Sequence, residues 1–152
     1  MKFLETRIVR GQHLGENTFR KINVFDGDYT TGYKIVEFKI ASSRLADATQ
    51  DVSGKLVTID DDVTSLKTGN IWNWEDNREV AWANSEMRVT NGPSLYREIV
   101  DEDAVLIEDI YFTYTTQAGA DDDPVNYYIK LAKFKLQPMV GTLNIVKNMS
   151  QG

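Results

Sequence analysis

Acidic side chains gather in three short stretches of the sequence, at residues 60–62, 101–103 and 121–123. Carboxylate oxygens are ligands that the hard cation Ca²⁺ prefers, so these stretches are candidate calcium sites. Their spacing matches no EF-hand loop, and charged loop residues also discourage edge-to-edge pairing of sheets. The sequence therefore favours solvated loop charge, and it predicts no metal and no cofactor.

All three tryptophans, Trp72, Trp74 and Trp82, fall within eleven residues. Trp72 and Trp74 on one face of an extended segment would form an aromatic platform for a sugar ring. The alternative, which we favour, is packing in the core or at a subunit interface, where tryptophan is enriched. Glu75 and Asp76 lie beside them, but adjacent residues of a strand point to opposite faces, so this pair cannot readily flank one glycosidic bond.

His13 is the only histidine, and the sequence contains no cysteine. Zinc sites built from histidine or cysteine, and Ser-His-Asp or Cys-His catalysis, are therefore excluded within one chain unless His13 serves alone. We expect His13 to be a solvated loop residue. We predict no catalytic residue and a protein that is not an enzyme; a cleft holding a perturbed carboxylate pair is the enzymatic alternative that the sequence leaves open.

The charge balance limits the partners that the protein can have. Seventeen basic and twenty-three acidic residues give a net charge of −6, which argues against direct binding of nucleic acid or of an anionic membrane. No apolar run reaches the roughly 18–20 residues that span a bilayer, and the N-terminus lacks the apolar core of a signal peptide. We therefore expect no membrane span and synthesis in the cytoplasm.

Residues 104–136 carry the strongest structural signal in the chain. Residues 105–116 and 125–136 are rich in β-branched and aromatic residues, and both segments alternate between apolar and polar positions. A polar loop at residues 117–124 separates them, so we predict a long hairpin that holds six of the sixteen aromatic residues and nucleates the core. We expect a β-bulge where the apolar face changes near Phe134.

Further strands are predicted along the rest of the chain. Their ranges are residues 3–10, 19–25, 36–40 and 52–59, with a possible short helical turn within 41–51. Val36, Phe38 and Ile40 should share one face. Asp26 and Gly27 form a typical two-residue hairpin turn. We also expect a bulge at Gly54 and a shared strand face for Val80 and Trp82.

These elements indicate an all-β fold with little helix. Seven to nine strands, with turn signals every 8–15 residues or so, predict one antiparallel β-sandwich domain over residues 1–152, with jelly-roll-like topology. The terminal segments 1–10 and 139–152 are candidates for extended arms that become ordered on a neighbouring subunit.

Five stretches give the chain a resemblance to a known class of protein. They read ETRIVRGQ, FDGDYTTGYKIVEFKIA, WNWEDNREVAWA, VNYYIKLAKFKL and IVKNMSQG, and they cover most of the sequence in order. The chain resembles the small virion structural proteins of bacteriophages from aquatic environments. The resemblance implies a β-sandwich capsid, vertex or accessory protein that is made in the host cytoplasm, resides in the virion and acts by assembly.

Assembly requires contact surfaces, and we predict three segments for them, residues 1–10, 72–82 and 139–152. The expected partners are further copies of the chain, in a homo-oligomer, and other virion proteins. The residues predicted at the interface are Phe3, Trp72, Trp74, Trp82, Met139, Val140 and Leu143. The alternative function is that of a carbohydrate-binding module that uses Trp72 and Trp74.

Overall fold

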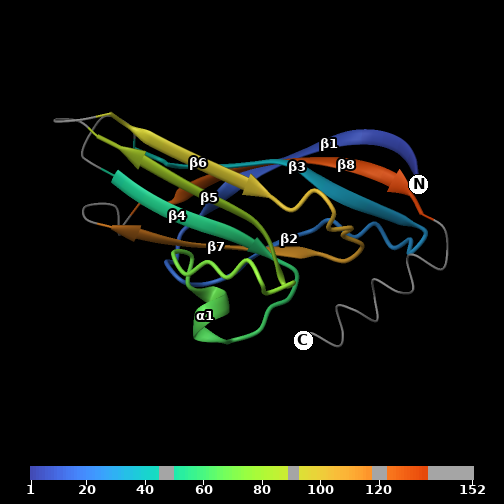
Figure 1. The fold of residues 1–152 in the computed structure, drawn as a ribbon, viewed down its shortest axis with the longest axis horizontal. Coiled ribbons are helices and arrows are strands. Elements are labelled where there is room, and N and C mark those ends of the chain that lie inside the picture. The colour runs from blue at the N-terminus through green and yellow to red at the C-terminus, as the bar shows by residue number, and fades with distance from the viewer. Residues whose placement is uncertain (45–49, 89–92, 118–122, 137–152) are drawn as a thin grey trace.

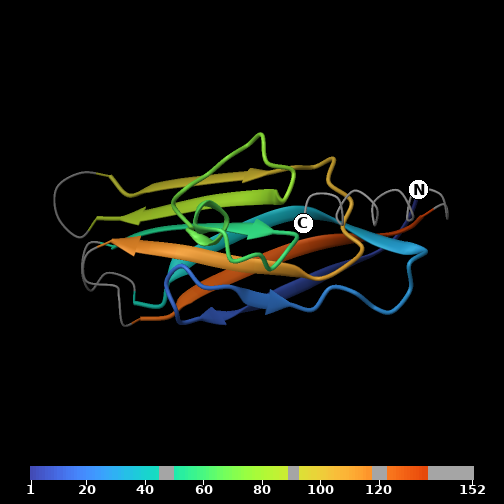
Figure 2. The same cartoon turned by 90° about the horizontal axis from the view of Figure 1, so that it is seen from below.

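Two antiparallel sheets packed face to face form the protein (Figure 1). The computed structural model describes residues 1–44, 50–88, 93–117 and 123–136, and within these ranges it contains eight strands and one short helix. The predicted all-β sandwich with little helix is therefore confirmed. Figures 1 and 2 show the strands of both sheets running along the long axis of the molecule.

The small sheet has three strands in the order β1-β8-β3. These are β1 (Lys2–His13), β8 (Val125–Lys135) and β3 (Thr31–Ser42). The large sheet has five strands in the order β2-β7-β4-β5-β6. They are β2 (Arg20–Ile22), β7 (Ile110–Gln117), β4 (Gln50–Val57), β5 (Glu79–Met87) and β6 (Leu95–Val100).

This strand order follows from a chain that changes sheet at four of its seven connections between strands. The neighbours β1-β8-β3 and β2-β7-β4-β5 are those of an eight-stranded jelly roll. β6 lies between the two sheets at their shared edge: it pairs with β5 over six residues, and its side chains also contact β3. The predicted jelly-roll-like topology is thus present, with β6 hydrogen-bonded to the large sheet.

The predicted hairpin of residues 104–136 is wrong, although most of both arms are strands. β7 pairs with β2 and β4, whereas β8 pairs with β1 and β3, so the two strands belong to different sheets. Their side chains meet across the interior, where the rings of Phe112 and Tyr127 lie 5.1 Å apart. The aromatic residues of this region therefore fill the core between the sheets, as expected, without the two strands pairing.

The turn at Asp26 and Gly27 is also not a hairpin, because β2 and β3 lie in different sheets. Gly27 has a φ of +87°, and Asp26 Oδ1 accepts a hydrogen bond from the backbone N–H of Asp28 at 2.9 Å. A tight, glycine-containing turn is present as the sequence indicated. It serves a connection from one sheet to the other.

Bulges explain why a side chain can face the side of a sheet opposite to the one that the alternation predicts. The register of β3 with β8 shifts between Ile35 and Glu37, which turns Val36 outward to 47 % exposure while Phe38 and Ile40 stay buried. β1 has a similar shift between Phe3 and Glu5. The bulge expected in β8 is therefore found in the two strands beside it.

β4 and β5 differ from the sequence prediction in two details. The register is continuous at Gly54, where an added Cβ would lie 3.0 Å from Phe112 Cε1; glycine is needed there for close approach. The shift occurs instead between Leu56 and Val57, opposite Val80. Val80 consequently joins the core, whereas Trp82 lies outside it.

The core occupies the space between the sheets. Its buried members are Ile22, Val24, Tyr33, Ile35, Phe38, Ile40, Val52, Leu56, Val80, Ala81, Ala83, Leu106, Ile110, Phe112, Tyr114, Val125, Tyr127, Ile129 and Leu131. The alternating residues of β8 supply four of these, as the sequence predicted.

Residues 58–78 cover the outer face of the large sheet; in Figure 2 they cross in front of β4 and β7. This covering segment includes α1 (Thr64–Lys67), whose N-terminus has no side-chain cap. So short a helix is not stable alone, and it is held by its contacts. Leu66 is 1 % exposed, and the N–H of Asn70 donates to Thr115 Oγ1 in β7 at 3.2 Å.

Candidate functional site

A buried ion pair fixes the covering segment to the large sheet. Lys55 projects from β4, and its Nζ donates to the carbonyl oxygens of Ser65 and Ile71 at 2.8 and 2.7 Å. It also donates to Glu79 Oε2 at 3.0 Å, and both charged side chains are at most 1 % exposed. Burial lowers the pKa of Lys55, and the carboxylate of Glu79 opposes that change.

The second oxygen of Glu79 is also fully used. Glu79 Oε1 accepts hydrogen bonds from the N–H of Asn73 and from Trp82 Nε1, both at 2.9 Å. Every polar atom of the pair therefore has a partner, and none faces solvent. This arrangement is structural: it ties residues 65–73 to β4 and β5 and offers no access to a substrate.

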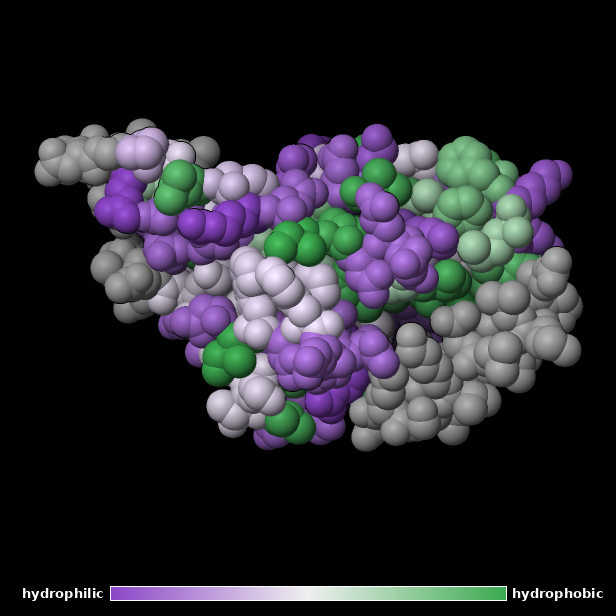
Figure 3. Space-filling view, in the orientation of Figure 1, coloured by the Kyte–Doolittle hydropathy of each residue, from purple (hydrophilic) through white to green (hydrophobic). Residues whose placement is uncertain are grey.

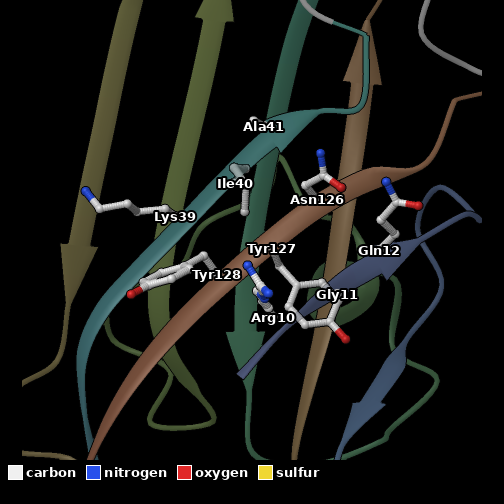
Figure 4. A pocket seen from close by; sticks show the side chains of 9 residues that line it. All are labelled: Arg10, Gly11, Gln12, Lys39, Ile40, Ala41, Asn126, Tyr127 and Tyr128. Atoms are coloured by element: carbon white, nitrogen blue, oxygen red, sulfur yellow. The ribbon is translucent and has the colours of Figure 1, made fainter. Parts of the chain in front are cut away.

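The outer face of the small sheet has no comparable covering segment in the described ranges. Two neighbouring rows of side chains there line a shallow trough of about 510 Å³ (Figure 4). In the first row, Tyr128 of β8 lies between Arg10 of β1 and Lys39 of β3. In the second row, Asn126 lies between Gln12 and Ala41. The trough thus combines an aromatic ring, two cations and two amides.

The charge of this face contrasts with that of the whole protein. The strand register places four cations and one carboxylate on it, namely Arg10, Lys34, Lys39, Lys130 and Glu37. Lys34 Nζ lies 5.9 Å from the ring centre of Phe134 on the same face. A basic face on a chain of net charge −6 is complementary to acidic surfaces.

β1 forms one edge of the small sheet, and among the described strands its one partner is β8. Phe3, Leu4 and Ile8 are 55, 44 and 52 % exposed along it. Figure 3 shows green, hydrophobic atoms gathered near the end of the molecule at which Figure 1 places the N-terminus. A long edge strand with exposed apolar side chains is a template for pairing with another strand.

The opposite edge of the small sheet is closed by side chains of β6. Glu98 Oε1 accepts from the N–H of Phe38 in β3 at 2.9 Å, and Tyr96 Oη donates to the carbonyl oxygen of Phe38 at 3.3 Å. Glu98 also pairs with Lys39 at 3.1 Å. Burial, reinforced by the charge of Glu98, raises the pKa of Tyr96 to about 12, so its hydroxyl stays a donor. The two edges of the sheet therefore differ.

The structure separates the three tryptophans predicted for an interface or a sugar platform. Trp82 is 5 % exposed, so its side chain offers a partner little surface. Trp72 is partly buried, and its Nε1 donates to the carbonyl oxygen of Gly69 at 2.9 Å. Trp74 is 64 % exposed and meets the ring of Trp82 edge-on at 6.2 Å. Only Trp74 presents most of its ring to solvent.

The other predicted interface residues lie at the two ends of the chain. Phe3 is exposed on β1, where its ring packs edge-on against Phe134 at 5.8 Å. Residues 3–10, expected as a strand and as part of the candidate arm 1–10, lie within β1 (Lys2–His13). Met139, Val140 and Leu143 lie outside the described residues.

The aspartate-rich stretches take part in loop contacts. Asp62 pairs with Lys67 at 2.5 Å, and Asp101 Oδ1 accepts from the N–H of Asp103 at 3.1 Å. Asp123 pairs with Arg44 at 3.2 Å, and residues 121 and 122 lie outside the described ranges. Among the described residues, no group of three or more acidic or histidine side chains is placed to hold a metal ion.

His13 is not the solvated loop residue that the sequence indicated. It ends β1, with its ring edge-on to Tyr114 at 5.5 Å and to Phe112 at 6.2 Å. Its Nε2 lies 3.0 Å from the carbonyl oxygen of Thr18. Burial lowers the pKa of His13 more than this bond raises it, and the charge of Arg20 lowers it further. The position thus favours the neutral imidazole.

Comparison with known proteins adds no family to this description. No protein-family model matches the sequence, and no curated protein matches it. Within the described part of the chain, no helix is long and apolar enough to cross a membrane.

Sequence reasoning missed both the trough and the buried pair. Arg10, Lys39 and Tyr128 come from three strands that meet only after folding, so no local motif marks them. Lys55 did carry a signal, since it is the one charged residue in the otherwise uncharged run VSGKLV of a predicted strand. A lysine at such a position points to a buried partner.

Proposed function

We propose that this protein is a virion structural component, in a capsid, vertex or accessory position, that acts by packing against copies of itself and against other virion proteins. The proposal rests on one observation above all: β1 offers a twelve-residue edge whose other side pairs with no strand of the described residues, with Phe3, Leu4 and Ile8 exposed along it. The jelly-roll order of the strands is compatible with this role, since capsid domains use it, but lectin domains share it.

The physical basis of such assembly is strand addition. The free side of β1 presents backbone N–H and C=O groups that a second strand can bind, and the exposed apolar side chains gain from leaving water. The neighbouring basic face adds attraction toward the acidic remainder of another copy.

Light scattering tests the proposal. The absolute mass of the purified protein, measured over a range of concentrations, should show a defined oligomer. Ile8→Lys should lower the mass, because it adds a charge to the exposed edge strand. The matched control is Ile71→Lys, which alters an isoleucine of similar exposure, 44 %, on the covering segment and should leave the mass unchanged. A monomer at every concentration would contradict self-assembly.

The virion itself supplies the second test. Mass spectrometry of particles purified from the virus that encodes the chain should find it at a fixed number of copies per particle. Its absence from purified particles, together with its presence in infected cells, would contradict a structural role.

A carbohydrate-binding function is the second candidate, and the trough around Tyr128 together with the exposed ring of Trp74 favours it. An aromatic ring beside amides and cations suits a sugar that carries an acidic group. The two rings lie on opposite outer faces of the sandwich and are separate candidate sites, so only the variant at the true site, Tyr128→Ala or Trp74→Ala, should abolish retention on a glycan column, without altering the melting temperature. Equal retention of both variants and the wild type would exclude these two rings as the site.

A further inference from the structure

We infer that β1 pairs antiparallel with β1 of a second copy, in the register that places Thr6 opposite Thr6. This inference rests on the proposed function, because it names the partner and the contact through which assembly begins. The occupant of the open edge is therefore a second copy of this chain.

The edge is suitable for such pairing beyond the bulge near its start. From Glu5 to His13, β1 pairs with β8 without a register shift, so its free side is a regular strand edge. Arg7 Nη2 donates to the carbonyl oxygen of Asn23 at 3.3 Å. Pairing of two identical antiparallel strands about a two-fold axis places one residue opposite itself.

Charge selects the residue at that centre. With Thr6 at the centre, Glu5 of each copy faces Arg7 of the other within the regular part of the strand, which gives two opposite-charge pairs. A centre at Glu5 or at Arg7 would instead bring like charges directly together. A centre at Ile8 would leave Glu5 and Arg7 facing uncharged residues.

Beyond Glu5 the bulge between Phe3 and Glu5 interrupts the regular register, so only the pairs close to the axis can determine it. The Glu5–Arg7 pairs lie beside the axis and gain most from the fixed strand geometry. The opposite-charge pairs beside the axis therefore determine which residues of the two strands face each other.

The pairing has a structural consequence. It joins two small sheets into one continuous sheet of six strands, in the order β3-β8-β1-β1-β8-β3. Both Tyr128 troughs then lie on the same face. Because each β1 has one free side, this contact closes at a dimer and leaves the remaining surfaces for further assembly.

Charge reversal tests the register. Glu5→Arg and Arg7→Glu should each weaken dimerisation about tenfold, because each variant turns two attractive cross-strand pairs into two repulsive ones. The double variant restores both pairs and should dimerise within about twofold of the wild type. Arg97→Glu, at an exposed position on β6, is the matched control and should have no effect. Sedimentation measures the dissociation constants, and thermal melting checks that each variant folds.

The outcomes separate the two proposals. An assembled wild type whose double variant stays as weak as the single variants would overturn this register and leave the structural function intact. A wild type that is monomeric at every concentration would overturn both. Recovery in the double variant supports the pairing of Glu5 with Arg7 across the edge.

Discussion

The outer faces of the two sheets differ in how far the chain covers them. The large sheet is covered by residues 58–78 of its own chain, which are fixed through the buried pair of Lys55 and Glu79. The small sheet has no such cover in the described ranges, and it exposes a trough, a basic face and the edge of β1. A buried polar network holds the covering segment on the large sheet. We propose that contacts with other molecules form at the small sheet, whose outer face is not covered in this way.

The largest loss of stability should come from removing the charge of Lys55, which holds residues 58–78 on the large sheet. Lys55→Met leaves Glu79 buried without its cation, which we expect to destabilise the protein by about 3–5 kcal/mol. Lys67→Met is the control, because its ion pair with Asp62 is exposed and should be worth less than about 1 kcal/mol. Urea unfolding measures both values. Equal losses of unfolding free energy in the two variants would contradict the view that the buried pair holds the covering segment.

A second test of the cover uses its closest approach to the sheet. A Cβ at Gly69 would lie 2.4 Å from Cα of Tyr114 in β7, so Gly69→Ala must push the covering segment away from the sheet. We expect a loss of about 1–3 kcal/mol in urea unfolding. Unchanged stability, with unchanged fluorescence of the tryptophans nearby, would show that the segment is not packed as described.

His13 links the two sheets, because its ring at the end of β1 contacts aromatic rings of β7. Its pKa is lowered in the folded protein, so the unfolded chain binds the proton more readily. The stabilising contribution is complete above the unfolded pKa of 6.5 and is lost as the pH falls through the lower, folded pKa. His13→Gln should lack this pH dependence. Urea unfolding from pH 8 to pH 5 measures it, and identical profiles would contradict the assignment.

The smallest effect on stability is expected from a substitution on the outer face of the small sheet. Ile8→Lys changes a side chain that is 52 % exposed, so the free energy of unfolding of the monomer should change by no more than about 0.5 kcal/mol. Its effect on association should be far larger. Urea unfolding at a concentration where the protein is monomeric provides the check, and a large loss would mean that Ile8 belongs to the fold rather than to a contact surface.

The sequence predicted the elements better than their pairing. Alternation identified the buried faces of β8 and most of β3, because it records which side of a strand faces the core. It could not tell a hairpin from two strands in opposite sheets, since in both arrangements the apolar rows of residues 110–116 and 125–131 face the same core. Which strands pair depends on contacts between distant segments, and local patterns do not record those.

The same limit applies to the candidate site. The exposed Phe3 could be singled out from the sequence because it lies in a single strand. The pairing of Lys55 with Glu79 joins residues on different strands, and the trough joins three. Val36 shows a further reason: one bulge reverses the facing that the alternation predicts.

Hydrogen exchange of the backbone amides at low and high protein concentration shows whether copies of the chain meet at the free edge of β1. If copies meet at the open edge, amides within residues 2–13 should gain protection as the concentration rises, while those of β4 and β5, in the interior of the large sheet, should not change. Protection that rises elsewhere with β1 unchanged would contradict the account, and so would association with no change in β1.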